Sequence, residues 1–150
     1  MLTGNIWILQ KQMNPVPDVV VPVNGDINKH GFAVMGRGLA LDASRFYPNL
    51  GREVAKWIST YGNTLAYHHT YRLYTFPVKE HWRDRASLDL ITRSCRDLAD
   101  SVKYRRELTR GQKILIPHVG CGNGKLDWKD VKPILESYLD PEFFVVVENA

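Results

Sequence analysis

The chain has 150 residues, of which 44% are hydrophobic and 24% are charged, and its formal net charge is +4. These values are ordinary for a globular protein and predict a single domain over residues 1–150 that buries roughly two-thirds of its unfolded surface. A membrane-length apolar run and a signal peptide are both absent, and Cys95 and Cys121 do not suffice for a disulfide scaffold, so we expect a cytoplasmic protein with no membrane partner.

Hydrophobic periodicity and turn residues divide the chain into alternating strands and helices. In chain order we expect a strand over 5–10, a loop over 12–17, a strand over 18–23, helices over 38–47 and about 50–61, strands over 64–67 and 71–78, a long helix over about 87–108, a strand over 113–116, a helix after Asp127, and a strand over 143–147. Gly62 is expected to cap the helix that precedes it, and the Asp127 side chain the helix that follows it.

This alternation predicts an α/β protein with a largely central sheet. The long helix is expected to bury one stripe, which includes Ile91, Cys95 and Leu98. In such sheets ligands bind in the crevice beyond the strand ends, where the connecting loops meet. The loops that follow strands are therefore the expected place for functional residues.

Two glycine-rich loops follow predicted strands and precede predicted helices. The first is residues 34–40, Val-Met-Gly-Arg-Gly-Leu-Ala, and the second is residues 118–125, His-Val-Gly-Cys-Gly-Asn-Gly-Lys. Glycine allows positive φ angles and close backbone approach, and backbone N–H groups at a helix N-terminus attract anions. Because two such loops in one small domain suit two linked phosphates, a diphosphate ligand is the leading hypothesis.

Neither loop fits a common nucleotide fingerprint. Residues 120–126 do not supply the Gly-x-x-x-x-Gly-Lys-Ser/Thr of a P-loop, and residues 36–41 lack the last glycine of Gly-x-Gly-x-x-Gly. The five histidines also show none of the usual metal-ligand spacings. We therefore expect neither a nicotinamide cofactor nor a metal.

Four motifs in this order resemble those of the macrodomain family: residues 23–25 (Val-Asn-Gly), 33–40, 75–79 (Thr-Phe-Pro-Val-Lys) and 117–128, which ends in Leu-Asp-Trp. The resemblance covers nearly the whole chain and is to the branch that contains the DarG-type antitoxin macrodomain and the terminal ADP-ribose protein glycohydrolase. It implies a three-layer α/β/α fold with a central mixed sheet that binds ADP-ribose. Many members of the family also hydrolyse the bond between ADP-ribose and a macromolecule.

The resemblance implies roles for individual residues. Asn5 occupies the position of a family residue near the adenine amine, and Asn24 that of an asparagine at the distal ribose. A structural role, at the start of a strand or in a turn, is the alternative for both. The two phosphate loops correspond to Met35, Gly36, Arg37 and Gly38, and to Gly120, Cys121, Gly122, Asn123, Gly124 and Lys125.

Lys79 is the expected catalytic residue. The resemblance implies that a lysine at this position removes ADP-ribose, in the human enzyme by attacking the anomeric carbon of the distal ribose. A lysine becomes a competent amine nucleophile when burial or nearby cations lower its pKa. His81, Arg83 and Arg85 are the candidate sources of that field. A phosphate contact or a solvated surface position is the alternative interpretation.

One position departs from the family pattern. The human glycohydrolase pairs its lysine with an aspartate in the second loop, where this chain has Gly124. The antitoxin type also lacks that aspartate and removes ADP-ribose from thymidine in single-stranded DNA. The expected function is therefore an ADP-ribosyl hydrolase, with DNA thymidine as the preferred attachment site and acidic residues of proteins second. Single-stranded DNA is a candidate partner.

Two other functions stay open at this stage. The glycine at 124 also suits a non-catalytic reader that only binds ADP-ribose. His118 suits a general acid in a phosphatase acting on ADP-ribose 1″-phosphate, or else a packing residue at a strand end. Tight packing explains Cys121 better than a reactive thiolate does. Trp82 suits stacking on a nucleobase, and a lid over the substrate or a helix-entry anchor are equal alternatives. Residues 26–32 form a segment longer than in the antitoxin pattern, so Asp26 and His30 are candidates to approach the distal ribose.

Overall fold

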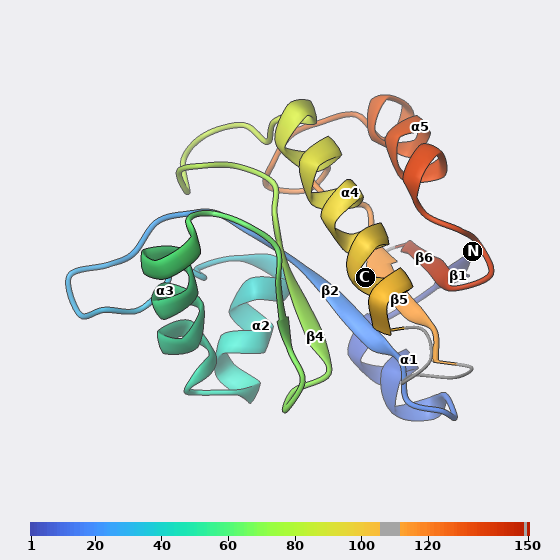
Figure 1. Ribbon diagram of the computed structural model, residues 1–150, viewed down its shortest axis with the longest axis horizontal. Helices are drawn as coiled ribbons and strands as arrows, with labels where there is room; N and C mark the ends of the chain where they lie inside the picture. Colours follow the sequence, from blue (N-terminus) through green and yellow to red (C-terminus); the bar gives the residue numbers. More distant parts are fainter. Residues whose placement is uncertain (106–111, 149) are drawn as a thin grey trace.

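Figure 1 shows the computed structural model of the protein, which describes residues 1–105, 112–148 and 150. The elements in this part of the chain are β1 (Leu2–Thr3), α1 (Ile6–Gln12), β2 (Asp18–Val23), α2 (Gly38–Phe46), α3 (Leu50–Tyr61), β3 (Ala66–His68), β4 (Leu73–Pro77), α4 (Leu88–Arg105), β5 (Ile114–Pro117), α5 (Trp128–Tyr138) and β6 (Phe144–Glu148). The end predicted for the long helix, residues 106–108, lies outside the described residues.

The described strands form one mixed sheet in the order β1-β6-β5-β2-β4-β3, which confirms the predicted α/β class. Neighbouring strands are parallel except for β3, which is antiparallel to β4. In the middle of the sheet, Val19 of β2 lies opposite both Leu73 of β4 and Leu115 of β5. Parallel pairing places the carboxyl ends of β1, β6, β5, β2 and β4 at one edge, from which their loops depart.

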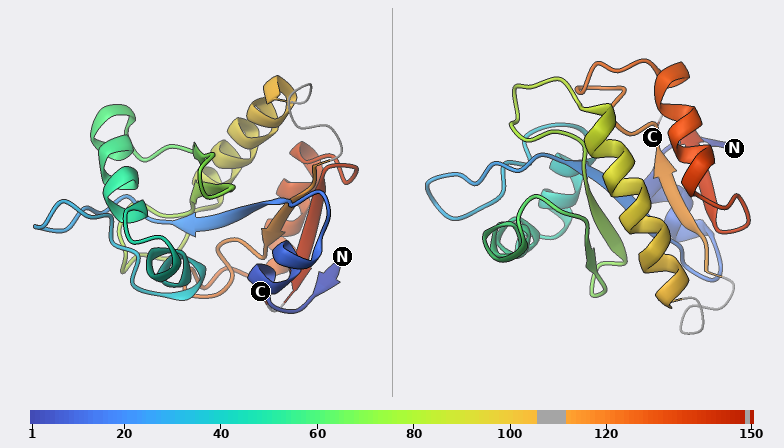
Figure 2. Two further views of the ribbon diagram at one scale, coloured as in Figure 1. Left: turned by 90° about the horizontal axis from the view of Figure 1, so that it is seen from below. Right: turned by 45° about the horizontal axis from the view of Figure 1, so that its top comes forward.

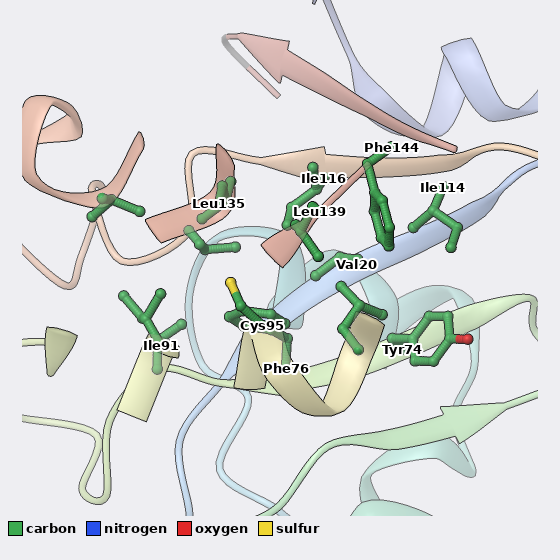
Figure 3. Close-up of a cluster of buried hydrophobic side chains, with 14 of the residues drawn as sticks. Val20, Tyr74, Phe76, Ile91, Cys95, Ile114, Ile116, Leu135, Leu139 and Phe144 are labelled. Carbon is green, nitrogen blue, oxygen red and sulfur yellow. The ribbon is translucent and has the colours of Figure 1, made fainter. Parts of the chain in front are cut away.

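The sheet lies between two helical layers, as expected for an α/β/α fold. Helices α4 and α5 cover one face, and α1 and α2 cover the other, with α3 packed beside α2 (Figure 2). Successive residues of β2 point to opposite faces. Val20 joins the cluster under α4 and α5, which Figure 3 shows with Ile91 and Cys95 among its side chains. Val19 and Val21 join the other cluster.

The prediction of a strand over 5–10 is wrong, because these residues form α1. The Asn5 side chain caps this helix by accepting hydrogen bonds from the N–H groups of Trp7 and Ile8, at 3.0 and 3.2 Å. Ile6, Trp7 and Gln10 are buried, but Ile8 is 55% exposed, which is helical rather than alternating spacing. The sequence prediction took an apolar run for a strand and overlooked the cap, which satisfies two otherwise unpaired N–H groups. It also missed the short edge strand β1.

Smaller differences occur at the ends of other elements. Strand β4 begins two residues later than predicted, since Arg72 adopts a turn conformation with φ +53°. Gly62 ends α3 as expected, with φ +82° and its N–H donating to the Ile58 carbonyl at 2.8 Å. Asp127 occupies the N-cap position of α5, but within the described residues its side chain makes no capping hydrogen bond, which corrects that prediction.

A buried ionic cluster lies at the amino end of β2. Asp18 is 2% exposed and accepts hydrogen bonds from the Tyr67 hydroxyl at 2.9 Å and from Gln112 Nε2 at 3.1 Å. An Arg105 guanidinium nitrogen lies 3.6 Å from the other carboxylate oxygen. Burial raises the pKa of Asp18, although the Tyr67 hydrogen bond and the Arg105 charge oppose the shift.

We expect Tyr67→Phe to reduce the free energy of unfolding by about 1–3 kcal/mol, because the buried Asp18 carboxylate loses one of its hydrogen-bond donors. Chemical denaturation at neutral pH measures the change. Tyr104→Phe, at a residue that is 87% exposed, is the matched control and should stay within about 0.5 kcal/mol. Equal effects of the two substitutions would show that the Asp18 cluster does not stabilise the fold.

Candidate active site

Three loops meet at the carboxyl edge of the sheet. The loops after β4 and β5 lie side by side (Figure 1, top), because the Ala86 N–H donates to the Gly124 carbonyl at 2.9 Å and Arg85 donates to the Lys125 carbonyl at 3.0 Å. The loop after β2 joins them at Gly38, where an added Cβ would lie 3.6 Å from the Asn123 side-chain nitrogen. Both glycine loops therefore lie at one edge of the sheet.

The glycines of these loops serve two different purposes. A Cβ at Gly124 would lie 2.5 Å from the Gly120 carbonyl oxygen, and a Cβ at Gly120 would lie 2.7 Å from Ile91 Cδ1. These two glycines allow the second loop to pack on itself and on α4. Gly36 and Gly122 are exposed, and an added Cβ at either would have no atom within 4 Å. They keep the backbone accessible from solvent.

Several backbone N–H groups of the two glycine loops have no partner within the described residues. Within the described part of the chain, no hydrogen-bond acceptor is found for the backbone N–H groups of Gly36, Arg37, Gly122, Asn123 and Gly124. Unpaired N–H groups grouped in glycine-rich turns form a concave site for anions. Met35 is buried in the core below the first loop, where it supports the backbone. These N–H groups are thus available to an anion, and their contact with a diphosphate stays a prediction.

Lys79 follows β4 and is partly buried, and its Nζ donates a hydrogen bond to the Trp82 carbonyl at 2.8 Å. Burial lowers the pKa of Lys79, and the positive charges of Arg37 and Lys125 lower it further, while Asp84 opposes them. The direction of this shift agrees with the sequence prediction. The two cations come from the two glycine loops, so Lys79 lies within reach of the charge of both.

The expected sources of the field around Lys79 are wrong. His81 contacts Asp26, with 2.9 Å between Nδ1 and Oδ1. The Arg83 guanidinium lies over the Trp82 ring, 5.6 Å from its centroid, and Arg85 is bound to the backbone of the second glycine loop. Sequence proximity suggested these residues, but each is engaged with another partner, and the charges that shift the Lys79 pKa are those of Arg37, Asp84 and Lys125.

The side chains of Asn24 and Asn5 both form hydrogen bonds with backbone groups of the protein. Asn24 donates to the Val34 carbonyl at 3.0 Å and accepts from the Asp26 N–H at 2.9 Å, so it shapes the loop after β2. Asn5 caps α1 at the carboxyl end of β1. Cys121 is half-buried, and burial raises the pKa of its thiol, which agrees with a packing role. Their contacts to a ligand remain predictions.

His118 follows β5 and stacks on Trp128, with ring centroids 3.8 Å apart and an interplanar angle of 3°. Its Nε2 atom is buried and has no partner among the described residues. Burial lowers the pKa of His118, which favours the neutral ring. This environment suits the packing interpretation.

One residue that holds the Lys79 segment, Asn63, escaped the sequence analysis. The Asn63 side chain donates to the Lys79 carbonyl at 3.1 Å and to the Glu80 carboxylate at 3.2 Å. A Cβ on Gly25 would lie 2.9 Å from Asn63, so only glycine permits this approach. Asn63 follows a helix-capping glycine, and that position predicts a turn rather than a contact across the sheet edge.

Within the described residues, no three His, Cys, Asp or Glu side chains are grouped so as to hold a metal ion. The helices of this same part of the chain include none with the length and apolar character needed to cross a membrane.

No protein-family model matches the chain. A curated relative from Mycobacterium tuberculosis, named DNA ADP-ribosyl glycohydrolase, is 34% identical over 113 residues, which are 69% of this chain and 31% of that protein. The solved macrodomain of Mycobacterium tuberculosis DarG has a TM-score of 0.68 at 28% identity and covers 87% of both chains. The macrodomain of Thermus aquaticus DarG has a TM-score of 0.72 at 25% identity, over 99% of this chain and 96% of that one. Thermosipho africanus DarTG, solved in complex with ADP-ribose, has a TM-score of 0.70 at 21% identity, over 87% of this chain and 37% of that one.

The three-layer fold, the strand order and these similarities identify the chain as a macrodomain. Within that family it is similar to the macrodomain of DarG, as the motifs of its sequence indicate. The chain spans 31% to 35% of the length of the curated relatives it matches.

We expect Gly124→Ala to lower the free energy of unfolding by about 1–3 kcal/mol, because the new methyl group overlaps the Gly120 carbonyl and Ala86. Gly122→Ala is the matched control in the same loop, and its open surroundings predict a change within about 0.5 kcal/mol. Chemical denaturation compares the two variants. A larger loss for Gly122→Ala would contradict the assignment of packing to Gly124 and of accessibility to Gly122.

Proposed function

We propose that this macrodomain binds ADP-ribose across its two glycine loops and hydrolyses the bond that joins ADP-ribose to a macromolecule. The observation that carries the proposal is the Lys79 amine, which lies near the edge where both loops meet and whose pKa is lowered by burial, Arg37 and Lys125. Such an amine is a competent nucleophile. The name of the curated relative, DNA ADP-ribosyl glycohydrolase, supports the same activity.

The order of strands along the edge supports one orientation of the ligand. Asn5 follows β1, the second and first glycine loops follow β5 and β2, and Lys79 follows β4. A ligand laid along this edge would have its adenine near Asn5, its diphosphate on the unpaired N–H groups and its distal ribose near Lys79. The distance from β1 to β4 is four strand spacings, about 19 Å, which suits an extended dinucleotide-like ligand.

The proposed step is nucleophilic substitution at the anomeric carbon of the distal ribose. The Lys79 lone pair forms a C–N bond to this carbon, and the bond to the leaving group breaks. The leaving atom keeps the electron pair and takes a proton from solvent. Water then adds to the anomeric carbon and releases the Lys79 amine and ADP-ribose. Arg37, Lys125 and the loop N–H groups hold the diphosphate and favour the uncharged amine beforehand.

Thymidine in DNA is the preferred attachment site, with acidic residues of proteins second. Trp82 is 50% exposed, and its ring has the Arg83 guanidinium over one face. An exposed indole beside an arginine is suited to stacking on a nucleobase of single-stranded DNA. We keep the cytoplasm as the expected location, because both cysteines are unpaired thiols.

We expect Lys79→Ala to abolish release of ADP-ribose, because the nucleophile is lost, and to leave the affinity for free ADP-ribose within about threefold of wild type, since the backbone donors remain. Mass spectrometry of an ADP-ribosylated thymidine oligonucleotide and of a glutamate-linked ADP-ribosylated protein measures release, and calorimetry measures binding. Lys79→Arg should be equally inactive, because it keeps a cation but has no nucleophilic amine at neutral pH.

Lys56→Ala, at an exposed position on α3, is the matched control and should keep wild-type turnover. Gly122→Glu is the binding-defective control, because it brings bulk and negative charge to the open face of the second loop. An active Lys79→Arg variant would reject the covalent step in favour of electrostatic assistance. Binding by wild type without release from either substrate would make the protein a reader.

The single-turnover rate should rise with pH along the titration of Lys79, because only the uncharged amine attacks. The midpoint should lie below that of an ordinary lysine. Lys125→Gln removes a cation that lowers the Lys79 pKa, so it should move the rising limb to higher pH, whereas Lys125→Arg should leave it in place. Rates measured at saturating substrate from about pH 6 to about pH 10, a window that extends well below the ordinary lysine pKa, test this shift. A profile that does not respond to Lys125→Gln would remove this cation from the mechanism.

A further inference from the structure

The segment 79–82, which carries Lys79, is attached to the loop after β2. The Gly25 N–H donates to the Glu80 carbonyl at 2.9 Å, so the two loops are joined by backbone immediately beyond the strand ends. The next attachment is made by a side chain, the carboxylate of Asp26. This carboxylate is 24% exposed and lies against the same segment.

The two carboxylate oxygens of Asp26 contact two consecutive residues, His81 and Trp82. Oδ2 accepts the Trp82 N–H at 2.8 Å, and Oδ1 lies 2.9 Å from His81 Nδ1. Partial burial by itself raises the pKa of Asp26, but the hydrogen bonds from His81 and Trp82 outweigh it and lower that pKa. The pKa of His81 is raised by its hydrogen bond to Asp26. The carboxylate is therefore a stable anion at neutral pH.

Asp26 is itself held by its own loop. Its N–H donates to Asn24 Oδ1 at 2.9 Å, and its carbonyl accepts the Val34 N–H at 2.9 Å. Asn24 in turn donates to the Val34 carbonyl at 3.0 Å. The anchor for segment 79–82 is thus fixed to the stretch of chain that leads into the first glycine loop.

Trp82 connects this anchor to Lys79. Its N–H is bound by Asp26, and its carbonyl accepts the hydrogen bond from Lys79 Nζ at 2.8 Å. A lysine side chain has four flexible carbons, so its amine is ill-defined in position unless an acceptor holds it. A catalytic group must be held near its productive geometry, and a displacement of about 1 Å can cost about a hundredfold in rate.

We propose that Asp26 is the positioning residue of the Lys79 amine: it holds the Trp82 peptide, whose carbonyl holds Nζ at the edge where the two glycine loops meet. The inference rests on the proposed function, because it names the residue that aims the proposed nucleophile. Asp26 acts through the backbone of Trp82 and not on the substrate.

Asp84 offers a matched control that separates position from charge. Asp84 and Asp26 both line the same cavity of about 450 Å³, together with His81, Trp82 and Arg83. The charge of Asp84 raises the pKa of Lys79. Among the described residues, however, the Asp84 side chain has no hydrogen bond to segment 79–82. Removal of the Asp84 charge therefore tests the effect of a nearby charge on Lys79. Removal of the Asp26 side chain tests the hydrogen bond that holds the Trp82 N–H.

The experiment compares wild type, Asp26→Ala, Asp26→Asn and Asp84→Asn in the oligonucleotide and protein release assays. We expect Asp26→Ala to lower kcat by about tenfold or more, with KM and the affinity for ADP-ribose within about threefold. Asp26→Asn keeps an oxygen that can accept the Trp82 N–H. Its loss in log kcat relative to wild type should be at most half of the loss measured for Asp26→Ala. On the high-pH plateau of the rate, where Lys79 is uncharged in every variant, Asp84→Asn should keep kcat within about threefold, because it changes only a charge that acts on the Lys79 pKa.

Side-chain NMR of the Lys79 Cε–Hε group, assigned with Lys79→Arg, gives a measurement that needs no turnover. Its signal should move in Asp26→Ala and remain near the wild-type position in Asp84→Asn. Wild-type kcat in Asp26→Ala, or an unchanged Lys79 signal, would overturn the positioning role. If wild type releases no ADP-ribose from either substrate, the hydrolase proposal fails, and the NMR comparison still decides whether Asp26 positions Lys79.

Discussion

The parallel register of β2 with β4 and β5 is the constraint on which the site depends. Val19 lies opposite Leu73 on one side and Leu115 on the other, so the three central strands end at nearly the same level. Their loops carry the first glycine loop, Lys79 and the second glycine loop. The buried valines of β2 maintain this register, since a shift of one residue would exchange the two faces of the strand. Residues that are far apart in the sequence meet because three strands end together.

The positive charges at this edge of the sheet favour the binding of an anion. The positive charges of Arg37 and Lys125 lie close enough to Lys79 to lower its pKa. Unpaired N–H groups of both glycine loops add partial positive charge in the same region. Like charges and unpaired donors are unfavourable in the free protein, and an anion that satisfies them would stabilise the folded state. The site therefore has, before any ligand binds, an electrostatic field that attracts an anion.

The macrodomain fold also determines how local residues are used. Gly120 and Gly124 allow the second loop to pack against α4, while Gly36 and Gly122 leave backbone open, so one residue type has two roles in one site. Asn24 and Asn5, both expected at the ligand, have side chains that shape a loop and cap a helix. These structural roles place the backbone at the edge, and so the asparagines contribute to the site through geometry even before any contact with a ligand.

The sequence by itself determined the α/β class, most helices and central strands, and both glycine loops, because these depend on local periodicity and on glycine between a strand and a helix. It also placed Lys79 after a strand, through the resemblance of its motif to macrodomains. The tertiary structure alone decided that residues 5–10 form a helix, since an asparagine cap and burial on one helical face outweighed an apolar run. It alone decided that Arg37 and Lys125, from the two glycine loops, lower the pKa of Lys79. The sequence neighbours His81, Arg83 and Arg85 have other partners. The tertiary structure also decided that Asp26 and Asn63 form hydrogen bonds with the segment that carries Lys79. Such contacts join residues brought together by strand order, and no local pattern in the sequence encodes the distance between them.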